Sequence, residues 1–329
     1  MSLSTDDRYD VMLKAAYLYY VDDRTQSEIS ALLNISRPTI IKLLNQAKQD
    51  GIVKIEVVDI RKTNRYIQME GSLRSLLKLD DVKIVESKQD EFPAIADAIG
   101  SEAAAYLSKM AKSRMRIGIG WGKTLEALSY KIKPNRDKTE IEFLPLLGCP
   151  GSSSNMGYTM FSNNTCERIA TNFEGSSINY LFAPLVAQNE TIANTFLKSE
   201  NVKMVMDKMN HLDLAIVGLD GGIAYSTTIE CEKLDESDID ELRRARIAGN
   251  ICTRFFDING SLCDVSLNRR VISISGEQLK KTPLVVAAAG GKHKVDSIVG
   301  ASRGGLFNVL ITDQFTAQKL IEYFKESNI

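Results

Sequence analysis

The feature that most constrains this chain is the alternation of short apolar runs with helical patterns after residue 80. Such alternation is typical of a parallel sheet covered by helices on both faces. We therefore predict an α/β fold, a Rossmann-like parallel-sheet domain, over residues 81–329. The expected strands are 82–85, 115–119, 141–147, 178–186, 214–217, 284–289 and 308–312. The expected helices are 93–110, 123–130, 164–173, 191–197, 202–209, 238–246, 294–302 and 314–325.

Length and charge bound the other possibilities. A chain of 329 residues is long enough for two domains, and 44% apolar residues can supply a large core. The 41 basic and 42 acidic residues leave a net charge of −1. Any contact with nucleic acid must therefore come from a local patch rather than from an overall positive charge.

The sequence shows no sign of a membrane, a secretion signal or a metal. Its longest fully apolar run is 284–289, far short of a membrane span, and residues 4–10 are polar and acidic. The five cysteines form no CxxC pair and only two histidines are present. We predict a cytoplasmic protein without a metal site.

Residues 1–60 have the pattern of a separate winged helix-turn-helix domain. A helix is expected over 8–20, and Thr25 with Glu28 fits a capping box that opens a short second helix, in which Leu32 would point inward. Ser36 is a suitable N-cap for a third helix that ends before Gly51. An alternating strand pattern follows at 52–60. This order of elements is typical of DNA-binding heads.

The polar face of the third helix predicts DNA binding. At 100° per residue, its lysine, asparagine and glutamine side chains lie opposite its apolar stripe, and these are the side chains that read base edges. Residues 36–54 contain four basic residues and one acid. The alternative is a three-helix dimerisation or linker module with a solvated face. The expected DNA-binding residues are Thr25, Ser36, Arg37, Thr39, Lys42, Asn45 and Gln46.

Residues 61–80 are expected to form a linker and a helix that carries the head or pairs with a second subunit. Beyond it, glycines follow the predicted strands at 118–122, 148–151, 218–222 and 290–291. The carboxyl ends of parallel strands are where ligands bind in such sheets. The glycine loops therefore predict a small-molecule site.

The loop from Gly120 to Thr124 is the most informative of these. It follows a strand and opens a helix, so its backbone N–H groups suit a phosphate. It is neither a Walker A loop, because the earlier glycine would fall on Ile117, nor GxGxxG, because the third position is Lys123. No nucleotide cofactor is indicated. The alternative is a tight turn without a ligand.

Three further residues are candidates near the strand ends. Lys294 could neutralise a phosphate or bond a sugar hydroxyl, or lie on the solvated surface. Asp257 could accept bonds from two sugar hydroxyls, or form an Asx-turn before Gly260. Trp121 either covers a ligand or packs in the core.

Several separated motifs resemble the SorC-type family of bacterial transcriptional regulators, which overlaps with some proteins called DeoR. The resemblance covers essentially the whole chain. It is carried, in this order, by residues 25–29, 35–39, 51–53, 118–124, 249–260, 294–305, 308–313 and 316–317.

The resemblance implies a sugar-binding domain related in fold to sugar-phosphate isomerases. It also implies an effector that is often a phosphorylated sugar, and a homotetramer that binds paired, pseudo-palindromic operator sites. Carried over by position, Gly120, Trp121, Gly122, Lys123 and Thr124 would form the phosphate loop and its cover, Asp257 and Lys294 would contact the sugar, and Gly148 and Ser152 would line the site. The cysteine and proline at 149–150 depart from the glycine-rich loop of many relatives.

We therefore expect a regulator of a carbohydrate-utilisation operon that is controlled by a sugar or a sugar phosphate, with no catalytic residue. An alternative is a sugar-phosphate isomerase with an accessory head, for which Glu126, Asp220 and Asp257 are the candidate bases and Lys294 the electrophile. A third hypothesis is a DNA-binding protein that binds no effector.

Overall fold

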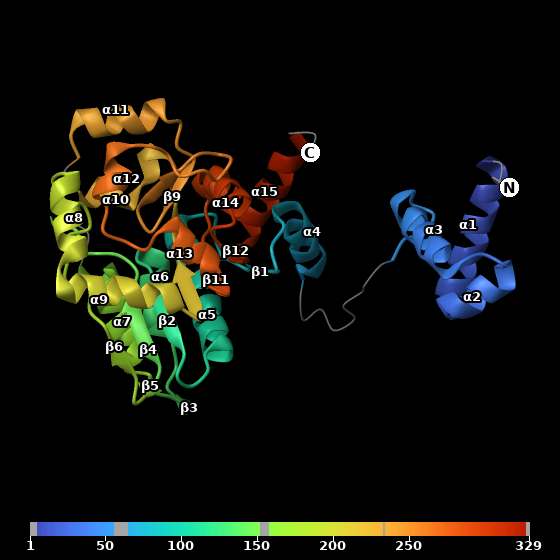
Figure 1. Ribbon diagram of the computed structural model, residues 1–329, viewed down its shortest axis with the longest axis horizontal. Helices are drawn as coiled ribbons and strands as arrows, with labels where there is room; N and C mark the ends of the chain where they lie inside the picture. The colour runs from blue at the N-terminus through green and yellow to red at the C-terminus, as the bar shows by residue number, and fades with distance from the viewer. Residues whose placement is uncertain (1–4, 56–64, 152–157, 233, 327–329) are drawn as a thin grey trace. The chain divides into compact units, whose positions relative to one another are not determined.

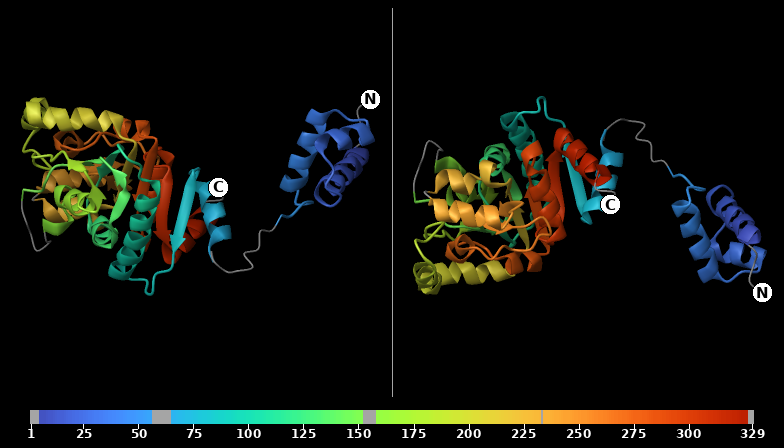
Figure 2. Two further views of the ribbon diagram at one scale, coloured as in Figure 1. Left: turned by 90° about the horizontal axis from the view of Figure 1, so that it is seen from below. Right: turned by 90° about the horizontal axis from the view of Figure 1, so that it is seen from above.

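The computed structural model describes residues 5–55, 65–151, 158–232 and 234–326. Contacts between residues divide the chain into two compact units, residues 1–65 and 66–329. Each unit is described by itself below. Figures 1 and 2 show the ribbon of both units.

The first unit is a three-helix head. Its helices are α1 (Thr5–Tyr20), α2 (Gln26–Leu33) and α3 (Arg37–Gln49). Their apolar faces meet in one small core that includes Ala15, Ile29, Ile40 and Leu44, each at most 3% exposed. The helix order and spacing agree with the helix-turn-helix expectation.

The entry to α2 follows the predicted capping box. The Thr25 hydroxyl accepts the Glu28 N–H, and the Glu28 carboxylate accepts the Thr25 N–H at 2.8 Å. Ser36 occupies the N-cap position of α3, but its hydroxyl bonds the Thr39 hydroxyl at 2.8 Å instead of a backbone N–H.

Two expectations for the head differ from the structure. Leu32 is 66% exposed, because α2 is short and turns only one of its sides to the core. Residues 52–55 form no strand. The rest of the expected strand, and the boundary at residue 60, lie outside the described residues.

The second unit is an α/β body. Its helices are α4 (Ile67–Leu77), α5 (Phe92–Met110), α6 (Lys123–Lys131), α7 (Ser162–Ala170), α8 (Glu190–Lys198), α9 (Glu200–Lys208), α10 (Thr227–Cys231), α11 (Glu236–Arg244), α12 (Ser266–Arg270), α13 (Gly276–Lys281), α14 (Val295–Arg303) and α15 (Gln314–Glu326). Short 3-10 turns lie at η1 (Tyr158–Met160), η2 (Met209–His211), η3 (Ile223–Tyr225) and η4 (Lys292–Lys294). Its strands are β1 (Asp81–Val85), β2 (Arg116–Ile119), β3 (Asn135–Thr139), β4 (Glu142–Pro145), β5 (Phe173–Glu174), β6 (Ser177–Ile178), β7 (Leu214–Val217), β8 (Leu219–Asp220), β9 (Gly249–Ile251), β10 (Arg254–Phe256), β11 (Leu284–Ala288) and β12 (Val309–Asp313).

Seven of the described strands form one sheet in the order β1-β12-β11-β7-β2-β4-β6, and every neighbouring pair is parallel. Successive residues of a strand point to opposite faces of the sheet, so each strand contributes side chains to the hydrophobic cores on both faces. In β7, Leu214 and Ile216 face α5, α6 and α7, whereas Ala215 and Val217 face α4, α9, α13, α14 and α15. The sheet is therefore covered on both faces, as the sequence predicts.

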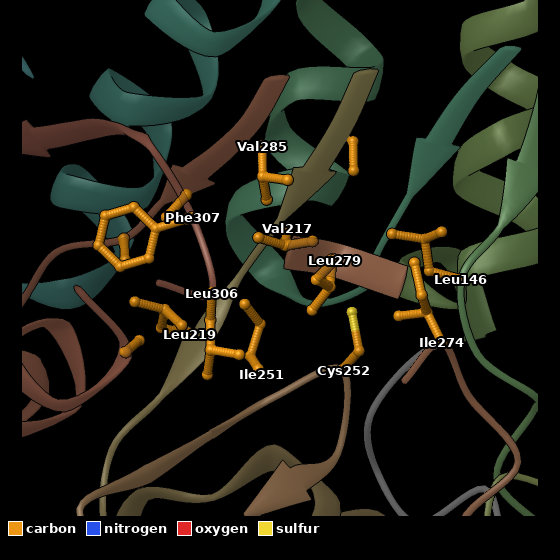
Figure 3. Packing of buried hydrophobic residues seen from close by; sticks show 14 of the residues in the cluster. Leu146, Val217, Leu219, Ile251, Cys252, Ile274, Leu279, Val285, Leu306 and Phe307 are labelled. Carbon is orange, nitrogen blue, oxygen red and sulfur yellow. The ribbon is translucent and has the colours of Figure 1, made fainter. Parts of the chain in front are cut away.

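A second, antiparallel sheet of β8, β9 and β10 stands beside the larger one. Its Ile251 packs with Val217 and Val285 of the main sheet and with Leu279 of α13 (Figure 3). This sheet was not expected from the sequence, because its strands are only two or three residues long.

Helix α4 belongs to the body in the structure. Leu73 and Leu77 are at most 3% exposed, and the Glu70 carboxylate accepts the Ile84 N–H at 2.9 Å. Helices α4 and α15, far apart in the sequence, lie side by side (Figure 2). The helix that we expected within residues 61–80 is therefore present, and it packs on the second unit.

The expected strand at 178–186 is wrong for most of its length, because β6 ends at Ile178. Leu181 and Leu185 are fully buried, but beyond Ile178 the segment is a loop. Its backbone makes isolated bridges, from Pro184 to Cys149 and from Val186 to Val271.

Candidate functional site

A cavity of about 570 Å³ opens at the carboxyl ends of β2 and β7. These two strands are neighbours, but the next strand of the sheet after β2 is β4, on one side of the pair, and the next after β7 is β11, on the other side. A crevice at such a switch point is the usual ligand site of a parallel α/β sheet. The cavity is lined by the loops that follow β2, β7 and β11 and by the start of α5.

One wall of the cavity is the start of α6. Gly122 is the N-cap residue with φ of 109°, a conformation that favours glycine, and Lys123 and Thr124 open the helix. All three residues line the cavity, and Thr124 is 4% exposed. The free N–H groups of a helix start and a lysine side chain together favour an anion.

Lys294 brings a second positive charge to the cavity, from the segment that follows β11. It ends η4 after β11, and its side chain is 6% exposed. Its Nζ lies 4.9 Å from the centre of the Phe92 ring. Within the described part of the chain, this ammonium has neither a hydrogen bond nor an ion pair. A buried ammonium without a hydrogen bond or an ion pair is costly, and an anionic group of a ligand would lower that cost.

Asp220 supplies negative charge to the same cavity. Its carboxylate accepts the N–H of Thr227 at 2.7 Å and the hydroxyl of Thr227 at 3.0 Å. Burial raises the pKa of Asp220, and the positive charge of Lys294 and the bonds from Thr227 oppose that rise. For Lys294, burial lowers the pKa, the charge of Asp220 raises it and Lys123 lowers it.

Aromatic rings form another side of the cavity. The ring of His293 lies 4.7 Å from that of Tyr225 and 5.8 Å from that of Phe92. Burial, with the charges of Lys294 and Lys292, lowers the pKa of His293 to about 4. His293 is therefore neutral at pH 7, and the three rings offer an apolar surface beside the charged groups.

The structure brings five of the expected effector residues together at this cavity. They are Trp121, Gly122, Lys123, Thr124 and Lys294. Gly120 and Gly148 are buried and do not line it. A Cβ at Gly148 would lie 2.5 Å from the Pro184 carbonyl oxygen, so this glycine permits a close backbone approach. Ser152 lies outside the described residues.

Asp257 does not reach the cavity. Its carboxylate accepts the N–H groups of Asn259 and Ser261, each at 2.9 Å, which is the Asx-turn that the sequence offered as the alternative. Phe92 and Tyr225 also line the cavity and were not expected from the sequence. An aromatic residue beside a helix start is usually part of a core, so no local signal marked them.

The expected DNA-contacting residues lie on one exposed part of the head. Arg37, Thr39, Lys42, Asn45 and Gln46 are all exposed, and the apolar stripe of α3 is buried behind them. The Gln46 amide donates to the Asp50 carboxylate at 2.7 Å. Thr25 and Arg37 also border a hollow at the start of α2.

In the residues that the structure describes, no group of three His, Cys, Asp or Glu side chains could hold a metal ion. No described helix is long and apolar enough to cross a membrane.

Comparisons with known proteins agree with this architecture. Residues 61–322 match the family model of the sugar-binding domain, Sugar-bind. The chain is 28% identical over 319 residues to the deoxyribonucleoside regulator of Bacillus subtilis, covering 96% of this chain and 98% of that protein. It is 26% identical over 320 residues to the sorbitol operon regulator of Klebsiella pneumoniae, and the match covers 97% of this chain and 100% of that protein.

A solved structure resembles the whole chain. The full-length sorbitol operon regulator SorC from Klebsiella pneumoniae has a TM-score of 0.71 and 27% identity, and the match covers 96% of this chain and 100% of that one. The chain therefore belongs to the SorC-type family of sugar-binding transcriptional regulators. These relatives are named as regulators, so the comparisons favour a transcriptional regulator and give no support to the isomerase alternative.

Proposed function

We propose that α3 reads a pseudo-palindromic operator and that a phosphorylated sugar, bound in the cavity at β2 and β7, controls this binding. The observation that carries the effector assignment is the buried ammonium of Lys294, which makes no hydrogen bond or ion pair with the described residues and lines the same cavity as Lys123. Two lysines and a helix start would balance the charge of one phosphate group.

The rest of the cavity suits the sugar part of such a ligand. A carboxylate such as that of Asp220 accepts hydrogen bonds from hydroxyl groups, and the rings of Phe92 and Tyr225 can pack against the C–H face of a sugar. The volume of about 570 Å³ lies within the range of small-molecule sites. In this proposal Asp220 accepts the hydrogen bonds of the sugar hydroxyls, a role that the sequence suggested for Asp257.

The names of the relatives support a carbohydrate ligand. They are named a sorbitol operon regulator and a deoxyribonucleoside regulator, so a sugar, a polyol or a phosphate of either is the proposed effector class. We also propose a homotetramer that acts in the cytoplasm and places one recognition helix in each operator half-site. Control requires different effector affinities in two arrangements, and a coupling of about 1–3 kcal/mol would change operator affinity roughly 5- to 150-fold.

The effector is tested by thermal unfolding of the full chain against a panel of sugars, polyols and their phosphates. A ligand at about 100 times its Kd adds about 2.7 kcal/mol to the unfolding free energy and raises the Tm. Lys123→Ala should abolish the shift. Lys131→Ala, at the other end of α6 and paired with Asp97 at 2.6 Å, should keep it.

The outcomes separate the parts of the proposal. A shift with a free sugar but not with its phosphate would contradict the phosphate assignment. A shift that survives Lys123→Ala would contradict the location. Binding to a selected DNA duplex that does not change when the stabilising ligand is added would contradict effector control.

A further inference from the structure

A buried polar pair lies where β12 passes into α15. Asp313 is the last residue of β12, Thr316 is in the first turn of α15, and both residues are fully buried. Neither is among the described residues that line the cavity at β2 and β7. Burying polar groups is costly unless hydrogen bonds replace their lost hydration, so the partners of this pair show what it holds.

The bonds of Asp313 fix the direction of the Thr316 hydroxyl. One carboxylate oxygen, Oδ1, accepts the N–H groups of Phe315 and Thr316 at 2.9 Å and 3.0 Å, as an N-cap does. The other, Oδ2, accepts the hydroxyl of Thr316. A hydroxyl has one hydrogen to donate, so the Thr316 oxygen is left to act as an acceptor. It accepts the N–H of Gly291, which follows β11, at 2.6 Å.

The bond to Gly291 reaches the segment that carries Lys294. Gly291 has φ of 105°, and its carbonyl accepts the Lys294 N–H at 2.9 Å, which closes the η4 turn. The preceding residue lies against the carboxylate, because a Cβ at Gly290 would lie 2.3 Å from Oδ2 of Asp313. The carboxylate and the hydroxyl therefore hold both glycines that precede η4.

The side chain of Lys294 depends on this main chain for its position. Its Nζ lies 4.9 Å from the centre of the Phe92 ring, and within the described residues it makes neither a hydrogen bond nor an ion pair. A lysine stem is flexible. Since no polar group among those residues holds the ammonium, its direction is set by the backbone that carries it and by the packing around the stem. A contact that anchors the backbone of η4 therefore also places the ammonium.

We propose that Asp313 and Thr316 are positioning residues for the effector. They hold the ammonium of Lys294 toward the anionic group of the ligand through the backbone of Gly291, and they do not touch the ligand themselves. This inference rests on the proposed function for the ligand that Lys294 meets. The anchoring of η4, in contrast, is a property of the chain that can be measured without a ligand.

The first measurement is hydrogen exchange of residues 290–294 in the full chain, followed by mass spectrometry. Thr316→Val keeps the shape of the side chain but removes the hydroxyl, so the N–H of Gly291 loses its acceptor. Exchange in this segment should become about tenfold faster, which is the size expected for one lost buried hydrogen bond. Thr316→Ser keeps a hydroxyl at this position and should retain the wild-type rate.

The second measurement is the affinity of the same variants for inorganic phosphate. It is read from the fluorescence of Trp121, the sole tryptophan in the sequence, which lines the cavity. Thr316→Val should weaken phosphate binding by a factor similar to the change in exchange, and Thr316→Ser should restore it. Thr316→Ala removes the same hydroxyl without a branched side chain, so it should reproduce both effects if valine prevents folding.

Thr282→Val is the matched control. Thr282 is 6% exposed, and its hydroxyl donates to the Gln278 carbonyl at 2.9 Å beside the end of α13. The control loses a bond of the same kind at a residue that does not line the cavity. It should therefore keep the wild-type exchange in residues 290–294 and the wild-type affinity for phosphate.

The outcomes separate this inference from the proposed function. Unchanged exchange in Thr316→Val and Thr316→Ala would show that the pair does not anchor η4, and would overturn the inference. Faster exchange with unchanged phosphate affinity would also overturn it, because the pair would then have a purely structural role. If the wild type and Lys294→Ala both fail to bind phosphate, the proposed anion site is wrong and the inference fails with it.

Discussion

Both carboxylate oxygens of Asp220 bind Thr227, one through the backbone N–H at 2.7 Å and the other through the hydroxyl at 3.0 Å. This pair ties the end of β8 to the start of α10, across the short turn that carries Tyr225. The aromatic wall and the acidic group of the cavity are therefore positioned by one contact.

Thr227→Val should loosen this wall. It removes the hydroxyl bond to the carboxylate but keeps the backbone bond, and we expect a loss of about 1 kcal/mol in unfolding free energy and weaker effector binding. Urea unfolding followed by the fluorescence of Trp121 measures the body, because this is the sole tryptophan in the sequence. Thr171→Val, which loses a bond to the Arg168 carbonyl on the surface, should leave effector binding unchanged.

The stability of the body should depend on Glu142 in acid. Burial raises the pKa of Glu142, but bonds from Lys208, Arg116 and Asn179 outweigh that effect and lower it from 4.5 to about 2. The folded state thus holds the proton less tightly than the unfolded chain. The resulting stabilisation is complete above pH of about 4.5 and is lost as the pH falls through about 2.

Glu142→Gln should remove up to about 3 kcal/mol at neutral pH and flatten the acid dependence. The control is Glu140→Gln, because the pair of Glu140 with Arg114 is exposed on both sides. It should change little at any pH. Equal acid profiles for Glu142→Gln and the wild type would contradict the assignment.

Two helical glycines should respond in opposite directions to alanine. At Gly100 in α5, a Cβ would lie 2.7 Å from the Cβ of Ala127 and 2.8 Å from the backbone N of Leu128, so α5 and α6 would have to separate. We expect Gly100→Ala to cost about 1–3 kcal/mol. At Gly71 in α4, a Cβ meets nothing within 4 Å, so Gly71→Ala should stabilise by about 0.5–1 kcal/mol. The urea midpoints of the two variants test this contrast.

The face of α3 should control DNA binding. With a duplex selected by the wild type from a random pool, Asn45→Ala should weaken binding by about 1–3 kcal/mol and relax the sequence preference. Lys42→Ala should lower the salt dependence by about one phosphate contact. Lys14→Ala, an exposed lysine on α1, should have no effect. Unchanged selectivity of Asn45→Ala would place the readout elsewhere.

Local signals predicted the elements that depend on local interactions. The capping box of Thr25 and Glu28 needs residues three apart, and the glycine turn before Lys123 needs one residue with positive φ. The buried strands at 214–217 and 284–288 stand out as apolar runs between turns. The family motifs added the sugar-binding fold. The cap and the turn form from neighbours in the chain, and the two strands are recognisable because a strand buried on both faces is an unbroken apolar run.

The strand expected at 178–186 failed for the opposite reason. Its apolar residues are buried, but a strand also needs a partner strand along its length, and beyond Ile178 the segment has only isolated bridges. A run of apolar residues indicates that a segment is buried, whereas its pairing as a strand depends on segments far away in the chain. The short strands β8, β9 and β10 could not be predicted in the same way. They are defined by their pairing with one another, and no apolar run marks them in the sequence.

The sequence by itself determined the class of the protein: a helix-turn-helix head, a parallel α/β body and a glycine loop suited to an anion. Only the tertiary structure decided which acid and which rings share the cavity with Lys123 and Lys294. Phe92, Tyr225 and Lys294 come from three distant segments, and the pairing of parallel strands brings those segments to one edge of the sheet. Asp257 also follows a strand and precedes a glycine, but its strand belongs to the antiparallel sheet. Its carboxylate therefore forms a turn instead of lining the cavity.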